Sequence, residues 1–241
     1  MAQLPSPEEI HQVLFSMGAF KASEPDGFHA YFYRTSWQII GEDITKFIQI
    51  IFITETIPQP LNHTKIILIP KNTNPELVTL FHPISLCNSL YKLIAKILVT
   101  QLKPFLNYFI HPGPAQLGYV LGRRTSDSYV LVQELIHYLQ HKKGKQGCFA
   151  TKIDLDKVYD RDRLNWHFIH ESLIFYKFPP STIDLIMNCV TTTTLKILWN
   201  GKEGPILPKQ GDLLSPYLFI ICLNRLTHDG PSYLYKESEA N

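Results

Sequence analysis

Two polar segments constrain this chain more than any other feature of its sequence. In the first, K-I-D-L-D-K-V-Y-D at residues 152–160, an apolar run ends in a carboxylate, Asp154, and an aromatic residue, Tyr159, follows it. The second segment, Q-G-D-L-L-S-P, occupies residues 210–216. A carboxylate at the end of a buried strand has the rigid support that a hard cation such as Mg²⁺ requires. The first segment is therefore a candidate metal site.

Other interpretations of the acidic segment are weaker. An EF-hand calcium loop starting at Asp154 would need Gly at its sixth position and Glu at its twelfth, but Tyr159 and Asn165 stand there. The histidines show no H-E-x-x-H pattern, which argues against a zinc hydrolase. A strand-end carboxylate without further context is more often structural than catalytic. The interpretation of Asp154 therefore depends on the motifs around it.

Composition bounds the class of protein. The chain has 241 residues, of which 45% are hydrophobic, so a substantial core can form and general disorder is excluded. The net charge of +2 does not decide for or against a nucleic-acid partner. No apolar signal core or membrane-length apolar run is present, so we expect a soluble, intracellular protein. The cysteines are isolated and predict free, mostly buried thiols. They are Cys87, Cys148, Cys189 and Cys222.

Hydrophobic periodicity predicts mixed helices and short strands. Residues 30–53 should form one or two helices, broken or bent near Gly41, and residues 71–83 should form a loop. Because strands and helices do not alternate strictly, the α+β class is favoured. Further helices are expected at residues 7–17, 89–106, 126–141, 164–175, 181–190 and 215–226. Strands are expected at residues 64–69, 148–155 and 191–199.

Six sequence motifs occur in the order found in one protein family. K-A-S-E-P-D-G-F is similar to that family's K-A-P-G-P-D-G-F, and F-H-P-I-S-L-C-N to its F-R-P-I-S-L-C-N. The family is the reverse transcriptase domain of LINE-type, non-LTR retrotransposons, especially of the plant type, which this chain resembles from about residue 21 to residue 226. Six motifs in order make chance agreement very small. The motifs lie at residues 21–28, 66–71, 81–88 with its continuation at 91–96, 116–123, 152–160 and 210–216, the last two being the first and second palm motifs.

The resemblance implies a right-hand polymerase fold. The expected structure is helix-rich, with fingers, a partial palm and a small incomplete antiparallel sheet. We expect an N-terminal helical segment at residues 1–63, a fingers-like region at 64–147, a partial palm at 148–227 and a polar tail at 228–241.

The resemblance also implies a catalytic centre for nucleotidyl transfer. Asp154 would bind Mg²⁺ as the metal-binding aspartate of the first palm motif, and the carbonyl of Leu155 could assist. Two such ions would activate a 3′ hydroxyl and steady the departing pyrophosphate. Tyr159 occupies the steric-gate position, where its ring would exclude a ribose 2′ hydroxyl and favour deoxynucleotides.

Other positions would bind the substrates implied by the resemblance, which are an RNA template, a DNA primer and deoxynucleoside triphosphates. Lys71 is the expected cationic clamp on the triphosphate. Gln210 and Gly211 match the second palm motif, whose backbone approaches nucleotide and template. Arg123 and Arg124 could contact template phosphates.

Several departures from the family pattern weaken the expected activity. Glu24 replaces a glycine, His82 replaces the arginine of F-R-P-I-S, and Leu213 replaces a proline. The paired aspartates of the third palm motif occur nowhere in the 241 residues. We therefore expect an RNA-directed DNA polymerase fragment that is inactive alone. The alternative is a non-catalytic remnant that binds RNA or a protein.

Overall fold

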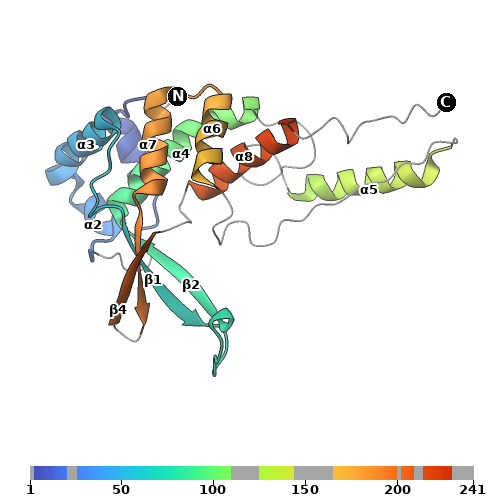
Figure 1. Ribbon diagram of the computed structural model, residues 1–241. Helices are drawn as coiled ribbons and strands as arrows, with labels where there is room; N and C mark the ends of the chain where they lie inside the picture. Colours follow the sequence, from blue (N-terminus) through green and yellow to red (C-terminus); the bar gives the residue numbers. More distant parts are fainter. Residues whose placement is uncertain are drawn as a thin grey trace.

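A four-stranded sheet projects from a body of packed helices, and the helix at residues 125–141 lies apart from that body (Figure 1). The computed structural model describes residues 3–20, 26–109, 125–143, 165–199, 202–208 and 214–229. The helices are α1 (Pro7–Phe15), α2 (Ala30–Thr35), α3 (Trp37–Thr54), α4 (Ser89–Phe109), α5 (Thr125–His141), α6 (Trp166–Phe175), α7 (Pro180–Thr191) and α8 (Ser215–Asp229). The strands are β1 (His63–Pro70), β2 (Phe81–Cys87), β3 (Thr194–Trp199) and β4 (Lys202–Pro208), with a short 3₁₀ turn, η1 (Val78–Leu80), before β2. The predicted helix-rich α+β class is confirmed.

Helix α4 is the centre of the hydrophobic core. Its apolar residues recur at helical spacing, and Leu93, Ile94, Ile97 and Leu98 are fully buried. Helices α1 and α8 both contact α4, although they come from opposite ends of the chain. The core therefore unites the N-terminal helices with the last described helix. Within the described residues, no helix is long and apolar enough to cross a membrane.

The first three helices begin and end at residues that their local contacts explain. Ser6 caps α1 by accepting a hydrogen bond from the Glu9 amide at 3.1 Å. The break between α2 and α3 lies at Ser36, so the predicted break near Gly41 is wrong. Gly41 lies inside α3, where a Cβ atom would stand 2.8 Å from Cε2 of Trp37. The glycine is explained by the close approach of this ring rather than by a turn.

The sheet is mixed rather than wholly antiparallel. Its order is β2-β1-β3-β4. Strand β1 pairs with β2, and β3 with β4, in the predicted antiparallel sense, but β1 and β3 are parallel, with His63 opposite Thr194. Parallel neighbours need a long crossover connection. The chain between β1 and β3 provides it, since that stretch contains α4 to α7.

Both edge strands contain prolines, which explains why sequence patterns missed them. Pro83 lies within β2, part of which was predicted as loop, and Pro205 and Pro208 lie within β4, which was not predicted. Proline lacks an amide donor, so it is normally tolerated only in strands at the edge of a sheet. The order of the strands places β2 and β4 at the two edges. The prolines are therefore compatible with strands at these positions.

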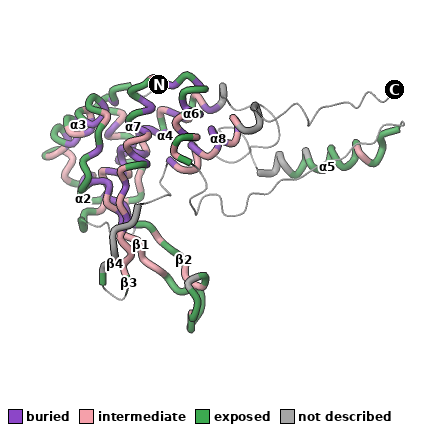
Figure 2. Tube along the Cα trace, viewed as in Figure 1, coloured by how far each residue is buried: buried purple, intermediate pink, exposed green. Residues whose placement is uncertain are grey.

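The sheet is buried only where it meets the helices. Leu86, Cys87 and Leu195 are buried near that junction, whereas Ile69 and Trp199 are exposed toward the far end. Figure 2 shows the same gradient along the projecting strands. Side chains near the tips of the strands therefore stand in solvent, where a ligand can reach them.

A buried polar network fixes the junction between sheet and helices. The side-chain amide of Asn62 donates to the carbonyl of Cys189 and to Oγ1 of Thr192, both at 2.9 Å. Its carbonyl oxygen accepts from Oγ1 of Thr193 at 2.9 Å. The backbone carbonyl of Asn62 accepts from the amide of Thr194 at 3.1 Å. This single residue thus ties the end of α7 to the starts of β1 and β3.

Candidate functional site

The end of the β1–β2 hairpin carries the one predicted binding residue that the structure describes. Lys71 follows β1 directly and is exposed. Its amide donates to the carbonyl of Leu80 at 2.8 Å, and its ammonium to the carbonyl of Thr79 at 3.0 Å. The lysine is therefore held against η1 with its charge at the surface. An anion at this end of the hairpin would meet a positioned cation.

His82 lies on the neighbouring strand of this hairpin. It is exposed on β2 and pairs with Ile69, close to the end of β1. The motif F-R-P-I-S, which this segment resembles, has an arginine at this position. A guanidinium is always charged, whereas an imidazole carries a full charge only when it is protonated. The hairpin end thus presents the ammonium of Lys71 and the imidazole of His82.

A turn before α2 is joined to the start of α4. The Asp26 carboxylate accepts from the side-chain amide of Asn88 and, at 3.1 Å, from the backbone amide of Phe28. Gly27 has φ of 81°, which suits glycine. Ser89 donates from Oγ to the carbonyl of Phe28 at 3.0 Å. These bonds connect the motif at residues 21–28 with the motif at residues 81–88.

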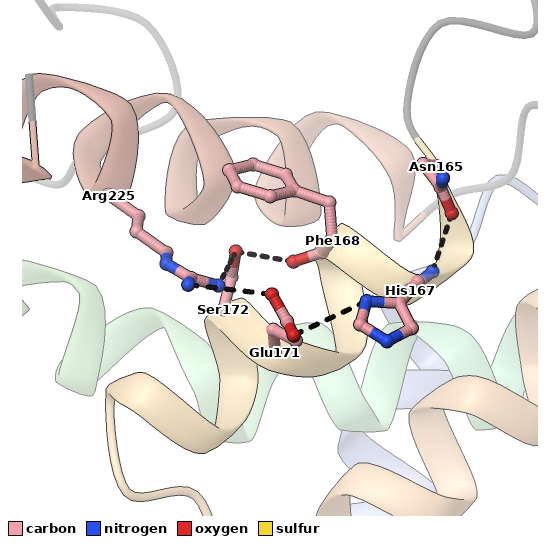
Figure 3. A network of polar contacts seen from close by, with 6 residues as sticks. All are labelled: Asn165, His167, Phe168, Glu171, Ser172 and Arg225. Atoms are coloured by element: carbon pink, nitrogen blue, oxygen red, sulfur yellow. Dashed lines mark hydrogen bonds and ion pairs between the residues drawn. The ribbon is translucent and has the colours of Figure 1, made fainter.

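Arg225 anchors α8 against α6 (Figure 3). Its side chain is 17% exposed and forms an ion pair with Glu171 at 3.6 Å. The guanidinium carbon lies 5.1 Å and 5.5 Å from the ring centroids of Phe168 and Phe175, within cation–π range. A bond from Nη1 to Oγ of Ser172 at 3.4 Å completes the contact. The second palm motif, at residues 210–216, ends in the first two residues of α8, so this anchor holds the helix that the motif enters.

Three cysteines among the described residues are free and buried, as predicted: Cys87, Cys189 and Cys222. Burial raises the pKa of the Cys222 thiol to about 11, although the hydrogen bond with Ser172 and the charge of Arg225 act in the opposite direction. The thiol is therefore neutral near pH 7 and is not a nucleophile there.

The raised pKa predicts a loss of stability in alkali. The ordinary pKa of this thiol is 9.0. Between about pH 9 and 11 the unfolded chain therefore releases a proton that the folded chain retains. The protonated thiol contributes at most about 3 kcal/mol to the free energy of unfolding. This contribution is fully present below pH 9 and is lost as the pH rises through 11. Denaturant unfolding at several pH values measures it. Cys222→Ser should show a smaller alkaline decline than the wild type. Equal declines would contradict the assignment.

The other predicted site residues lie outside the described residues. These are Asp154, Leu155, Tyr159, Gln210, Gly211, Arg123 and Arg124. Within the part of the chain that the structure describes, no group of three or more His, Cys, Asp or Glu side chains could hold a metal ion.

Comparison with known proteins identifies the family. A sequence model described as "Reverse transcriptase (RNA-dependent DNA polymerase)" matches residues 69–235. That match covers more than half of the chain and extends from the end of β1 through α8. The chain belongs to the reverse transcriptase family. The match includes Lys71, His82 and every palm residue predicted above.

Three relatives come from transposable elements. The "Transposon TX1 uncharacterized 149 kDa protein" of Xenopus laevis is 26% identical over 195 residues, covering 80% of this chain and 14% of that protein. The Pol polyprotein of the type-2 retrotransposable element R2DM of Drosophila melanogaster is 27% identical over 183 residues, covering 73% of this chain and 16% of the relative. The corresponding polyprotein of element R2 of Popillia japonica is 26% identical, covering 75% of this chain and 25% of the relative.

These relatives confirm the non-LTR retrotransposon resemblance. This reverse transcriptase domain spans between 14% and 25% of the length of the three relatives. What those longer proteins do beyond the shared region belongs to them alone.

Some contacts of functional interest were not predicted from the sequence. Asp26 and Asn88 each belong to a motif, but the two residues are 62 positions apart in the sequence. Their contact forms only when the chain folds. Arg225 had no signal beyond a cation close to the apolar run L-F-I-I-C-L of α8. Phe168 and Phe175 lie at helical spacing and could have suggested that a cation packs against their rings. The sequence did not indicate that this cation is Arg225.

Proposed function

We propose that this domain contributes the fingers and the first part of the palm to RNA-directed DNA synthesis. It would hold an RNA template, a DNA primer and a deoxynucleoside triphosphate. The family match over residues 69–235 carries this proposal. The positioned ammonium of Lys71 at the exposed hairpin end supports the role of a triphosphate clamp.

The remaining roles follow the same family pattern. Asp154, with the Leu155 carbonyl, would supply oxygen ligands to Mg²⁺, the type of ligand that this ion prefers. The metal would stabilise the charge that develops on the transferring phosphoryl group. Tyr159 would exclude the ribose 2′ hydroxyl, and Gln210 with Gly211 would present backbone to the nucleotide.

We also propose that the 241-residue polypeptide does not catalyse synthesis alone. It contains no two consecutive aspartates, and a single carboxylate cannot fix two divalent ions at the separation that in-line transfer requires. Losing a principal catalytic ligand commonly lowers the rate by several orders of magnitude. Binding of template or nucleotide would not need that second ligand set.

Primer extension with Mg²⁺ tests both statements. A primed RNA template and deoxynucleoside triphosphates should give no product above the background of a mock preparation, and Asp154→Ala should be indistinguishable from the wild type. An active retroviral reverse transcriptase serves as the positive control. Robust extension that Asp154→Ala removes would contradict the proposed inactivity and would establish Asp154 as a catalytic ligand.

A second function, RNA binding without chemistry, is favoured by a cavity that three lysines of α4 line. It predicts salt-dependent binding of RNA that Asp154→Ala does not change. Replacing Arg123 and Arg124 by glutamine should weaken that binding. Binding that does not respond to salt would argue against this function.

A further inference from the structure

A cavity of about 280 Å³ lies where α4 meets α1, α2 and α8. Three lysines line it, namely Lys92, Lys96 and Lys103, and we name them the α4 lysines. The ring of Tyr217 and the apolar side chains of Met17 and Val99 complete much of the wall. The described residues that line the cavity include no carboxylate. The cavity therefore combines positive charge with an apolar, partly aromatic surface.

The α4 lysines form a row along one helical face. Spacings of four and seven residues return to the same face of an α-helix. At a rise of about 1.5 Å per residue, the row from Lys92 to Lys103 extends about 16 Å. All three lysines are half-buried, and a lysine in such a position commonly packs its apolar stem against protein and keeps its ammonium toward water. The row is too long for a single phosphate, but it suits an extended polyanion.

Two of the ammonium groups are positioned by contacts with other helices. Lys96 donates from Nζ to the carbonyl of Ser16, just after α1, at 3.1 Å. Nζ of Lys103 lies 5.9 Å from the ring centroid of Tyr217 on α8. The Ser16 and Ser89 hydroxyls donate to backbone carbonyls of Val13 and Phe28. Both serine hydroxyls are thus engaged with the backbone, and the α4 lysines are the cationic groups among the described lining residues.

We propose that this cavity is a groove for a single strand of RNA, with the α4 lysines on its phosphates and Tyr217 against a base. Grooves for single strands typically combine a row of cations with aromatic rings on which bases stack. Helix α8, which carries Tyr217, begins with the last two residues of the second palm motif, so the groove adjoins the segment proposed to meet the template. This inference rests on the proposed function, because it assumes that RNA is the polyanion.

Fluorescence anisotropy with a labelled single-stranded RNA of about 20 nucleotides tests the groove. The variant K92Q/K103Q removes two charges but keeps Lys96, whose ammonium bonds to Ser16. Each phosphate contact contributes about 0.7 to the slope of log affinity against log salt. The slope should thus fall by about 1.4, and affinity should fall roughly 25-fold near 0.1 M salt.

The matched control removes two exposed lysines elsewhere. Lys46 on α3 and Lys177 after α6 do not line the cavity. K46Q/K177Q has the same net charge as the test variant and should change the slope by much less. Equal effects of the two variants would overturn the groove, while RNA binding by the wild type would leave the proposed function standing. Absence of any RNA binding by the wild type would instead overturn both.

The aromatic wall makes a separate prediction. Base stacking on a protein ring is commonly worth about fivefold to a hundredfold in affinity. Tyr217→Ala should lose affinity in that range without changing the salt slope, and Tyr217→Phe should bind as the wild type does. Equal binding by the alanine variant would remove Tyr217 from the groove.

Lysine acetylation of the wild-type protein keeps the test independent of how variants fold. RNA should protect the α4 lysines from acetylation and leave Lys46 and Lys177 reactive, as read by mass spectrometry of the digested protein. Polyglutamate at equal charge serves as the competitor that represents an acidic protein surface. If polyglutamate protects these lysines and RNA does not, the occupant is an acidic protein segment and the RNA assignment fails.

Discussion

Replacing Ile48 by alanine should destabilise the protein by about 3 kcal/mol. Ile48 lies on the inner side of α3 and is 0% exposed, so truncation removes buried apolar contacts and leaves a cavity in the core. Alanine is a better helix former than isoleucine, but that gain is only about 0.4 kcal/mol. A small protein is typically stable by about 5–15 kcal/mol, so the expected loss is a large share. Urea unfolding with an unchanged m-value measures it.

The same helix provides a matched control. Ile39 is 84% exposed, so Ile39→Ala makes the same chemical change where no core contact is lost. The gain in helix propensity applies to both variants, and the exposed one should stay within about 0.5 kcal/mol of the wild type. If the two variants lose stability equally, α3 does not pack through the face described above.

The second large effect is expected at the junction of sheet and helices. Asn62 is 1% exposed, and its side chain makes the three hydrogen bonds that connect α7 to the start of the sheet. Asn62→Ala should cost about 2–4 kcal/mol, because each buried bond is worth roughly 1 kcal/mol and partners left without one add a desolvation penalty. Thermal or urea unfolding measures the loss. Asn72, which is exposed after β1, is the control, and Asn72→Ala should be almost neutral.

A double-mutant cycle separates the network from the rest of the junction. Thr193→Val removes the hydroxyl that donates to the Asn62 carbonyl oxygen at 2.9 Å. Combining it with Asn62→Ala should give a coupling energy above about 0.5 kcal/mol, since the two residues share a bond. Additive effects would show that the two side chains do not interact as described.

Local sequence patterns predicted the helices well, because helix formation depends on residues that are close in the sequence. The period of apolar positions predicted a helix at residues 89–106, within a few residues of the observed bounds of α4. The break between α2 and α3 at Ser36 was not predicted, because a glycine commonly indicates a helix break and Gly41 lies nearby. Its actual role is to admit the ring of Trp37, a packing relation that the sequence does not display.

The sheet was harder to predict because its strands depend on pairing. Pro83 and Pro205 argue against strands until the sheet order shows that β2 and β4 are edges. For the candidate site, motifs indicated Lys71 and the family, and both predictions rest on short stretches of sequence. The contact between Asp26 and Asn88 and the row of the α4 lysines beside Tyr217 arise only when distant segments meet.

The parallel pairing of β1 with β3 has a consequence for synthesis on the ribosome. Bonded partners such as His63 and Thr194 are separated by 131 positions. The β1–β2 hairpin can close early, but the other side of β1 has no partner until α7 has emerged. During that interval an apolar strand with unsatisfied amides stands open to other chains. Nascent polypeptides arrested between β2 and β3 should therefore bind chaperones or aggregate, and completing β3 should end that vulnerability.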